Sequence, residues 1–191
     1  VMVEAATSTH AEILRSAARI FAQVGYRAAT MQGIASAAGF TPPTLYAHFG
    51  SKQGIFEGLG DALTAELYAV LGRELPKGLT LAQFLELRIR DVLELAERQR
   101  DVFVMVIVRP YDLPDLDPVR DDHALLQRHW ESIFEERRDE LSDRTATEAA
   151  LLLEGVLYAS VKLWLRSGED RIAHRTPRLV DMILHGLGSS R

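Results

Sequence analysis

The chain repeats apolar side chains at helical spacing along nearly its whole length of 191 residues. An apolar residue at every third or fourth position forms one face of an amphipathic helix. The first such run is Ile13, Leu14, Ala17, Phe21 and Val24, and Gly25 follows where that helix would end. No pair of segments carries the alternating pattern and tight turn of a β-hairpin. The sequence therefore predicts an all-α fold of about nine helices.

Capping residues and glycines predict where these helices begin and end. Threonine or serine favours the position before a helix, proline the first helical position, and glycine the position after the last turn. These signals predict short helices after Thr30 and Thr41, and a longer helix from Ser51 to about Gly72. Further helices are expected over residues 80–98, 126–141, 146–166 and 177–187.

Residues Val102–Val108 form an uninterrupted apolar run that fits either a buried strand or a buried helix. Because no second strand candidate exists to pair with it, we interpret the run as a short buried helix. Pro110, Pro114 and Pro118 then predict an irregular acidic loop. Its aspartates lack the spacing and the glycine of a calcium-binding loop, so we expect no metal site there.

Composition excludes several classes of protein. The absence of cysteine excludes a disulfide scaffold, thiolate zinc sites and a cysteine nucleophile. The longest apolar stretch, 149–165, is interrupted by Glu154 and Lys162 and is a poor membrane span. Residues 1–10 show no secretory signal pattern. We find no phosphate loop, dinucleotide fingerprint or nucleophile elbow. The sequence predicts a soluble cytoplasmic protein that is not an enzyme and has no cofactor and no membrane partner.

Residues 30–49 have the pattern of two short helices joined by a turn at Gly39 and preceded by a longer helix. This is the helix-turn-helix arrangement. The small residues Ala35, Ala37 and Ala38 allow the two helices to cross closely, so that the second one protrudes. A protruding helix fits the major groove of DNA and presents its N-terminal residues to base edges.

The segment Phe21–Lys52 resembles the DNA-binding head of TetR-family transcriptional regulators. The resemblance is carried by AQVGY at 22–26, Thr30, Ile34-Ala35, Ala38-Gly39 and TLYAHFGSK at 44–52. It implies a helix-turn-helix DNA-binding domain at residues 1–50 and a helical domain at residues 51–191 that binds an effector and forms dimers. Residues 176–187 also look like the last helix of that family, but the rest is similar only in layout.

The resemblance implies a DNA-binding surface. Its expected members are Thr30, Thr41, Pro42, Thr44, Tyr46, His48 and Lys52. Hydroxyl and ammonium groups at Thr30, Tyr46 and Lys52 suit phosphate contacts. Thr41 and Thr44 suit contacts with base edges, and His48 suits either. Alternatively, Thr30 and Thr41 only cap their helices, and Tyr46 lies half in the core.

Two features depart from the family pattern. Pro42-Pro43 stands where the family commonly has a basic or small residue, so base reading would rely on Thr41, Thr44, Tyr46 and DNA shape. Residues 1–60 also carry only four Lys or Arg against three Asp or Glu, and the remainder carries 18 against 24. This charge balance predicts modest nonspecific affinity and a weak dependence on salt.

The segment 146–166 is apolar on nearly all sides, and such a helix must be covered on every side. Gly155 and Ala159 allow another helix to approach closely. Together with residues 177–187, this segment matches the last two long helices through which the TetR family forms two-fold dimers, so the resemblance implies a homodimer interface here. Two heads about 34–36 Å apart would then read the half-sites of a roughly palindromic operator.

Polar residues among apolar ones in the second domain suggest a site for a small apolar or amphipathic effector. The candidates are Phe103, Met105, Tyr111, Trp130, Phe134, Glu154, Tyr158 and Lys162. Glu154, Tyr158 and Lys162 follow one another at intervals of four residues and share a helix face. In the alternative interpretation, the two charged residues are solvated or pair across the dimer, and the aromatic residues belong to the core.

Three functions remain open on the sequence. The first is a ligand-responsive regulator, a repressor that a small molecule releases from its operator. The second is a helical carrier or enzyme whose head no longer reads DNA, which the double proline and weak charge favour. The third is a DNA-binding protein that responds to a partner protein instead of an inducer.

Overall fold

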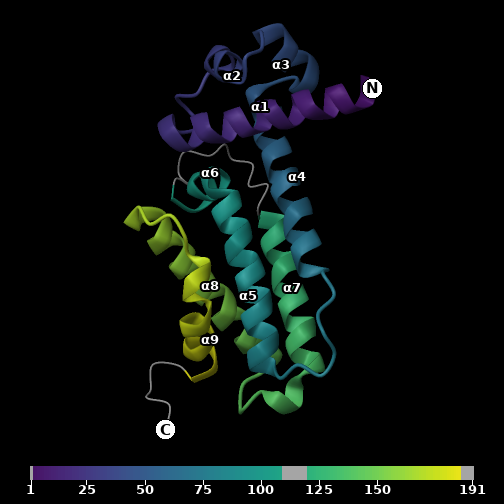
Figure 1. The fold of residues 1–191 in the computed structure, drawn as a ribbon, viewed down its shortest axis with the longest axis vertical. Helices are drawn as coiled ribbons and strands as arrows, with labels where there is room; N and C mark the ends of the chain where they lie inside the picture. Colours follow the sequence, from purple (N-terminus) through teal and green to yellow (C-terminus); the bar gives the residue numbers. More distant parts are fainter. Residues whose placement is uncertain (1, 109–119, 186–191) are drawn as a thin grey trace. The chain divides into compact units, whose positions relative to one another are not determined.

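The computed structural model describes the backbone of residues 2–108 and 120–185 and the side chains of residues 9–108 and 126–185. Within these ranges the chain forms nine α-helices and no β-strand, so the predicted all-α class is confirmed (Figure 1). The helices are α1 (Met2–Val24), α2 (Met31–Ala38), α3 (Pro42–Phe49), α4 (Lys52–Leu71), α5 (Leu81–Arg98), α6 (Arg100–Phe103), α7 (Arg120–Glu136), α8 (Ala146–Ser167) and α9 (Thr176–His185).

The chain divides into two compact units. The first, which we call the head unit, comprises Val1–Ala65 and Gln99–Val119. The second, the larger helical unit, comprises Glu66–Arg98 and Arg120–Arg191. Helix α4 therefore begins in one unit and ends in the other. None of the helices in the described ranges is long and apolar enough to cross a membrane.

Helices α1, α2 and α3 of the head unit surround a common apolar core. Phe21, Ile34 and Leu45 contribute one buried side chain from each helix. The predicted cap of α2 is confirmed, because the Thr30 hydroxyl accepts a hydrogen bond from the Gly33 N–H at 3.0 Å. Gly39 ends α2 at φ 75°, a left-handed conformation in which glycine avoids the strain of a side chain.

The segment 100–108 completes the head core. It is helical, as predicted, although only α6 is α-helical, and Val104–Val108 forms a π-helix. Val102 and Met105 pack into the same core as Phe21 and Leu45, which accounts for the unbroken apolar run. The predicted acidic loop that follows lies outside the described residues.

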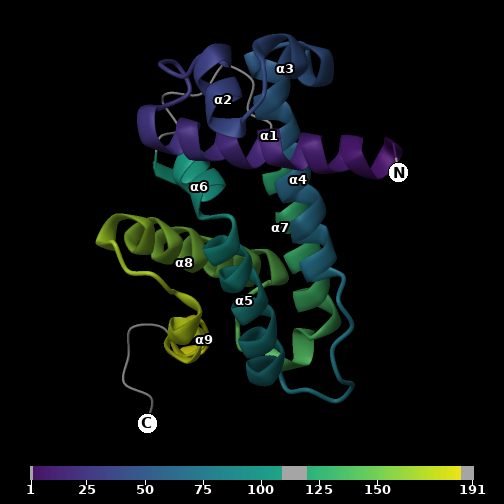
Figure 2. The same ribbon diagram turned by 45° about the horizontal axis from the view of Figure 1, so that its top comes forward.

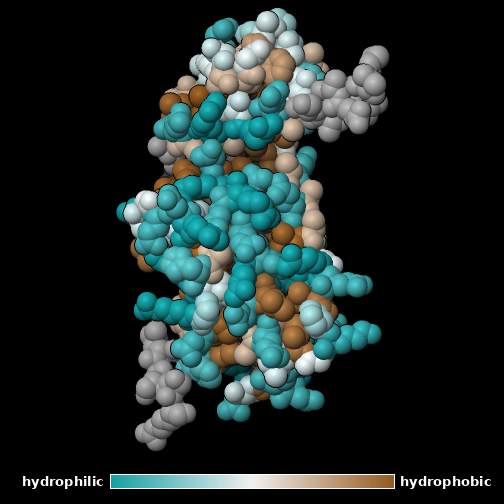
Figure 3. All heavy atoms as spheres, in the orientation of Figure 1, coloured by the Kyte–Doolittle hydropathy of each residue, from teal (hydrophilic) through white to brown (hydrophobic). Residues whose placement is uncertain are grey.

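The larger helical unit is built from α5, α7, α8 and α9. Helix α7 packs along α8, and α9 packs against both α5 and α8 (Figures 1 and 2). Trp130 and Phe134 of α7 and Trp164 of α8 are its largest fully buried side chains. The face drawn in Figure 3 is mostly hydrophilic, and apolar residues reach it only in separate patches.

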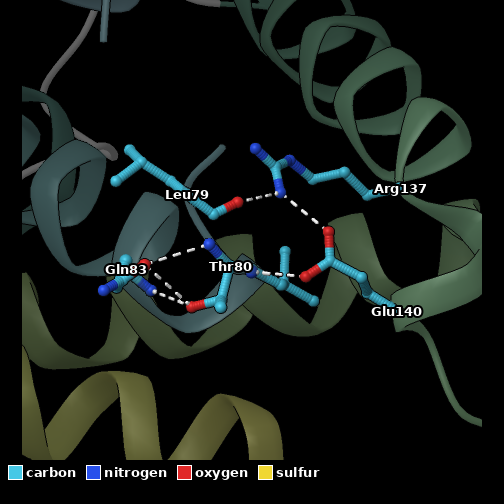
Figure 4. A network of polar contacts seen from close by, with 6 residues as sticks. Leu79, Thr80, Gln83, Arg137 and Glu140 are labelled. Carbon is cyan, nitrogen blue, oxygen red and sulfur yellow. Dashed lines mark hydrogen bonds and ion pairs between the residues drawn. The ribbon is translucent and has the colours of Figure 1, made fainter. Parts of the chain in front are cut away.

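A polar network fixes the N-terminus of α5 to the segment after α7 (Figure 4). Arg137 Nη1 donates to the Leu79 carbonyl at 3.0 Å and to Glu140 Oε1 at 2.8 Å. The second oxygen of Glu140 accepts the Leu81 N–H at 2.6 Å. A carboxylate at this position satisfies one of the free N–H groups at a helix start and complements the helix dipole.

Candidate DNA-binding surface

Three side chains with no exposed surface hold the helix-turn-helix together. Ile34 and Ala35 of α2 and Leu45 of α3 are 0% exposed. The Ser16 hydroxyl of α1 also donates to the Ala37 carbonyl at 3.4 Å. These contacts pack one side of α3 against the core and leave its other side exposed.

The two threonines that the sequence places at helix starts behave differently. Thr30 caps α2 and is exposed, so the cap leaves its hydroxyl group accessible. Thr41 occupies the capping position of α3, but its side chain makes no capping hydrogen bond, and that part of the prediction is wrong. Pro42 and Pro43 have no N–H, and the Thr44 N–H, three residues on, donates to the Thr41 carbonyl at 3.0 Å instead of to the side chain. The Thr41 hydroxyl lies instead 2.9 Å from the Thr44 hydroxyl.

Tyr46 and His48 both lie on the exposed side of α3. Tyr46 is 53% exposed, so it does not adopt the half-core position that the sequence left open. The His48 ring lies 6.2 Å from the ring of His10 in α1, measured between centroids. The His10 ring in turn packs 4.2 Å from Phe49, which links α1 to the end of α3.

Lys52 makes contacts that the sequence did not indicate. Its ammonium group donates to the carbonyls of Tyr26 and Ala29, each at 2.8 Å, and to that of Arg27 at 3.3 Å. It also lies 4.5 Å from the centroid of the Tyr26 ring, and burial lowers the pKa of the Lys52 ammonium. Lys52 therefore joins the start of α4 to the turn after α1, and its contact with a phosphate stays a prediction.

The predicted effector residues are divided between the two units. Met105 is buried in the head core, and Phe103, two residues earlier in the chain, is half-buried. Trp130 and Phe134 are each 1% exposed in the core of the larger helical unit. Tyr111 lies outside the described residues. A ligand contact by any of these residues stays a prediction.

The polar members of the effector set lie along α8. Glu154 is half-buried, and its Oε1 is enclosed without a hydrogen-bond partner. Burial, and then the carboxylate of Glu131, raise the pKa of Glu154. The Lys162 ammonium lies 5.5 Å from the centroid of the Tyr158 ring, which fits their predicted position on one helix face.

The larger helical unit also holds a second set of buried polar groups, which the sequence pattern did not predict. Arg88, 5% exposed, donates to the carbonyls of Val70 at 2.5 Å and Arg73 at 2.9 Å. Asp91 pairs with Arg73, and His129 Nε2 is enclosed without a partner. Burial, and then Arg88, lower the pKa of His129, which favours the neutral ring. The signal was present, because Arg88 falls on the apolar stripe of α5, three residues after Leu85.

The outer face of α8 is the most apolar part of the described surface. Six large apolar side chains are exposed among the described residues, and three of them, Leu151, Tyr158 and Leu163, belong to α8. A shallow groove on this helix, which we call the α8 groove, is lined by Leu151, Leu152, Gly155, Val156, Ala159, Ser160, Leu163 and Met182. Within one chain, the apolar helix is therefore covered on one side only.

Comparison with known proteins places the head in a family. Residues 13–59 match the family model described as bacterial regulatory proteins of the tetR family. No curated protein matches the sequence. The fold resembles the TetR-family regulator PfmR of Thermus thermophilus, with 22% identity, coverage of 93% and 96% of the two chains and a TM-score of 0.74.

Two further solved structures agree with this likeness. FadR of Bacillus subtilis, determined in complex with stearoyl-CoA, has 17% identity, coverage of 93% and 98%, and a TM-score of 0.77. GusR of Salmonella enterica has 22% identity, coverage of 93% and 95%, and a TM-score of 0.70. At these identities the likeness concerns the fold.

A core-anchored helix-turn-helix with an exposed second helix is an arrangement that DNA-binding domains use. Residues 13–59 match the model of the tetR-family regulatory proteins, and the chain has the fold of TetR-family transcriptional regulators. The resemblance that the sequence indicates is thereby confirmed.

Proposed function

We propose that the protein is a ligand-responsive repressor that binds a palindromic operator as a homodimer and is released by a small-molecule effector. The observation that carries this proposal is the exposed side of α3, where Tyr46 is 53% exposed while Leu45 beside it is fully buried. A helix held by one side on a core can enter a major groove by the other. Thr30 at the start of α2 and Tyr46 would contact phosphates. Since its target is DNA, we place the protein in the cytoplasm.

The α8 groove supports the homodimer. Exposed leucines on a helix with small residues between them present an apolar surface that a second copy of the same helix can cover. Gly155 and Ala159 provide those small residues, and a Cβ at Gly155 would meet no atom within 4 Å in the single chain. A two-fold dimer would present two α3 helices to the two half-sites of a palindrome.

The larger helical unit supports an effector site for an apolar or amphipathic molecule. The enclosed oxygen of Glu154, which has no hydrogen-bond partner, offers a polar anchor for such a molecule. FadR of Bacillus subtilis was determined with stearoyl-CoA, an amphipathic ligand. Effector binding would favour a conformation of the dimer that fits the operator less well. Because α4 has residues in both units, it is our candidate for the element that couples them.

The first experiment is a selection of duplexes from a randomised DNA pool with the purified chain. We expect an enriched palindromic motif, and we expect Tyr46→Ala to lose it. Tyr68→Ala is the matched control, because Tyr68 is similarly exposed at 45% but lies on α4 in the larger helical unit. No enrichment by a folded wild-type chain would favour the carrier or enzyme alternative.

A panel of acyl-CoA esters, fatty acids and other amphipathic molecules then tests the effector. We expect at least one of them to release the selected duplex and to raise the melting temperature of the protein. If no small molecule releases the DNA, the regulator that responds to a partner protein becomes the better description.

A further inference from the structure

The side chains of α3 limit which base edges it can recognise. Its sequence, PPTLYAHF, contains no arginine, lysine, asparagine or glutamine. These four side chains make the characteristic contacts with guanine and adenine in the major groove, mostly through two simultaneous hydrogen bonds. Helix α3 therefore has no side chain that recognises a purine in this way.

The first turn of α3 is also poor in hydrogen-bond donors. Pro42 and Pro43 have no N–H. The Thr44 N–H donates to the Thr41 carbonyl at 3.0 Å and is not free. The hydroxyl groups of Thr41 and Thr44 lie 2.9 Å apart, so one of their two hydrogens is shared between them. A single hydroxyl hydrogen remains for DNA from the four residues 41–44.

The same turn is rich in small apolar groups. Thr41 and Pro43 are exposed, and Pro42 and Thr44 are half-buried. Because each threonine hydroxyl faces the other threonine, the methyl group on the same Cβ points in a different direction. The first turn thus offers methyl groups and proline rings where most recognition helices offer polar side chains.

We propose that the first turn of α3 recognises thymine through its C5-methyl group, by apolar contact with Thr41, Pro43 and Thr44. The thymine methyl is the apolar feature that distinguishes one base edge from the others in the major groove. A donor-poor apolar turn matches that edge and does not match guanine. This inference rests on the proposed function, and it specifies thymine as a base within each operator half-site.

Replacement of thymine by uracil tests the proposal, because uracil keeps every hydrogen-bonding group and lacks only the methyl. The selected duplex is rebuilt with uracil at one thymine position of both half-sites at a time, and affinity is measured by fluorescence anisotropy. We expect a loss of about fourfold for each contacted methyl, since burial of one such group favours binding by about that factor. Thymines outside the half-site should show no loss.

A second variant separates methyl contact from an effect of uracil on DNA shape. Thr44→Ser keeps the hydroxyl and removes the methyl from the protein. We expect Thr44→Ser to bind the thymine duplex about fourfold more weakly and to lose discrimination against uracil at the thymine that Thr44 contacts, while thymines contacted by Thr41 or Pro43 stay sensitive. Thr147→Ser on the exposed side of α8 is the matched control and should behave as wild type.

Two results would overturn the inference while the proposed function stands. One is a selected half-site in which no thymine is sensitive to uracil. The other is a uracil effect that stays unchanged in Thr44→Ser, in Thr41→Ser and in Pro43→Gly, which would indicate recognition of DNA shape. Absence of any selected duplex is a different outcome, because it contradicts the proposed function itself.

Discussion

At the scale of single residues, Lys52 shows how a residue suited to DNA contact is used inside the protein. Three carbonyls from the turn after α1 accept hydrogen bonds from its ammonium group. Hydrogen bonds to charged groups contribute more to stability than neutral ones. With all three N–H groups engaged, Lys52 would have to give up a protein contact to bind a phosphate.

We expect Lys52→Met to lower the free energy of unfolding by about 1–3 kcal/mol, because the carbonyls lose their donor. DNA affinity should fall because the head is destabilised, but the slope of log affinity against log salt concentration should stay unchanged. A direct phosphate contact would reduce that slope by about 0.9. Denaturant unfolding and a salt titration measure the two effects, with exposed Lys77→Met as the control.

Glu154 should make stability depend on pH. An unfolded glutamate has its ordinary pKa near 4.3, and burial raises the pKa of Glu154 in the folded chain. The folded state therefore keeps a proton that the unfolded state has lost. Stability should fall as pH rises from the unfolded pKa to the folded pKa, and then stay level.

Glu154→Gln should remove this pH dependence. The stability of the variant relative to wild type should increase with pH across that window, measured as melting temperature from about pH 4 to about pH 8. Glu136→Gln, at an exposed position on α7, is the control, and its melting temperature should change with pH in the same way as that of wild type. Parallel curves for Glu154→Gln and wild type would show that burial of this carboxyl costs the folded state nothing.

Residue roles were predictable where their partners are close in sequence. Thr30 caps α2 through an N–H three residues away, and residue type and spacing indicate that contact. Thr41 fails as a side-chain cap for an equally local reason: two prolines follow it, and the Thr44 N–H donates to the Thr41 carbonyl. In contrast, Lys52 contacts carbonyls 23 to 26 residues away, and Arg88 contacts carbonyls 15 and 18 residues away. Such contacts depend on the packing of helices, which periodicity does not determine.

At the scale of elements, the close approach of α4 to the end of α3 positions the DNA-binding surface. A Cβ at Gly54 would lie 2.1 Å from the Phe49 carbonyl oxygen, which is a backbone atom and cannot move without its helix. The Ser51 hydroxyl caps α4 at the same place by accepting the Gly54 N–H at 3.0 Å. The short connection between the two helices therefore requires glycine at position 54.

We expect Gly54→Ala to destabilise the chain by at least about 1–3 kcal/mol, the usual cost of overpacking, and to abolish operator binding. Gly58→Ala is the matched control on the same helix. There the nearest atoms are side-chain carbons of Leu14 and Phe49 at 3.3 Å, which can shift. Equal stability of the two variants by denaturant unfolding would contradict this account of the α3–α4 connection.

Helix ends were harder to predict than helix positions. Helix α7 begins at Arg120, six residues before the first apolar residue of its stripe, Leu126. Asp121 and Asp122 fall in its first turn, where negative charge favours a helix start. The apolar stripe marks only the part of a helix that packs on a core, so it does not predict the turns that come before its first residue. For the same reason α1 extends well before Ile13.

At the scale of the whole molecule, the α8 groove is a surface that a single chain does not cover. The chain's own helices bury one side of α8 and leave Leu151 52% and Leu163 62% exposed. The sequence indicated a need for cover on every side, but periodicity alone does not say whether a neighbouring helix or a second chain supplies it. The structure shows which side of α8 its own chain covers, and the oligomeric state decides whether a second chain covers the other side.

Leu163→Glu should therefore convert a dimer into a monomer without unfolding it. The side chain contributes little to the fold of the single chain, so the free energy of unfolding of the monomer should change by no more than about 0.5 kcal/mol. In the dimer, each of the two copies would bury the carboxylate of its Glu side chain in an apolar interface, which strongly disfavours association. Sedimentation equilibrium at micromolar concentration measures the mass, and circular dichroism checks the helix content.

The control for this change is Tyr68→Glu, which places the same charge at an exposed apolar position outside the α8 groove and should leave the dimer intact. A monomeric variant should bind the operator more weakly than the dimer. A monomer has one head and contacts one half-site, whereas a dimer gains affinity from contacting both half-sites at once. If the Leu163→Glu chain stays dimeric, the dimer interface does not lie on the α8 groove. A monomeric chain that still selected the full palindrome would mean that the two half-sites are bound independently, and the proposed route from effector to DNA through the dimer would then fail.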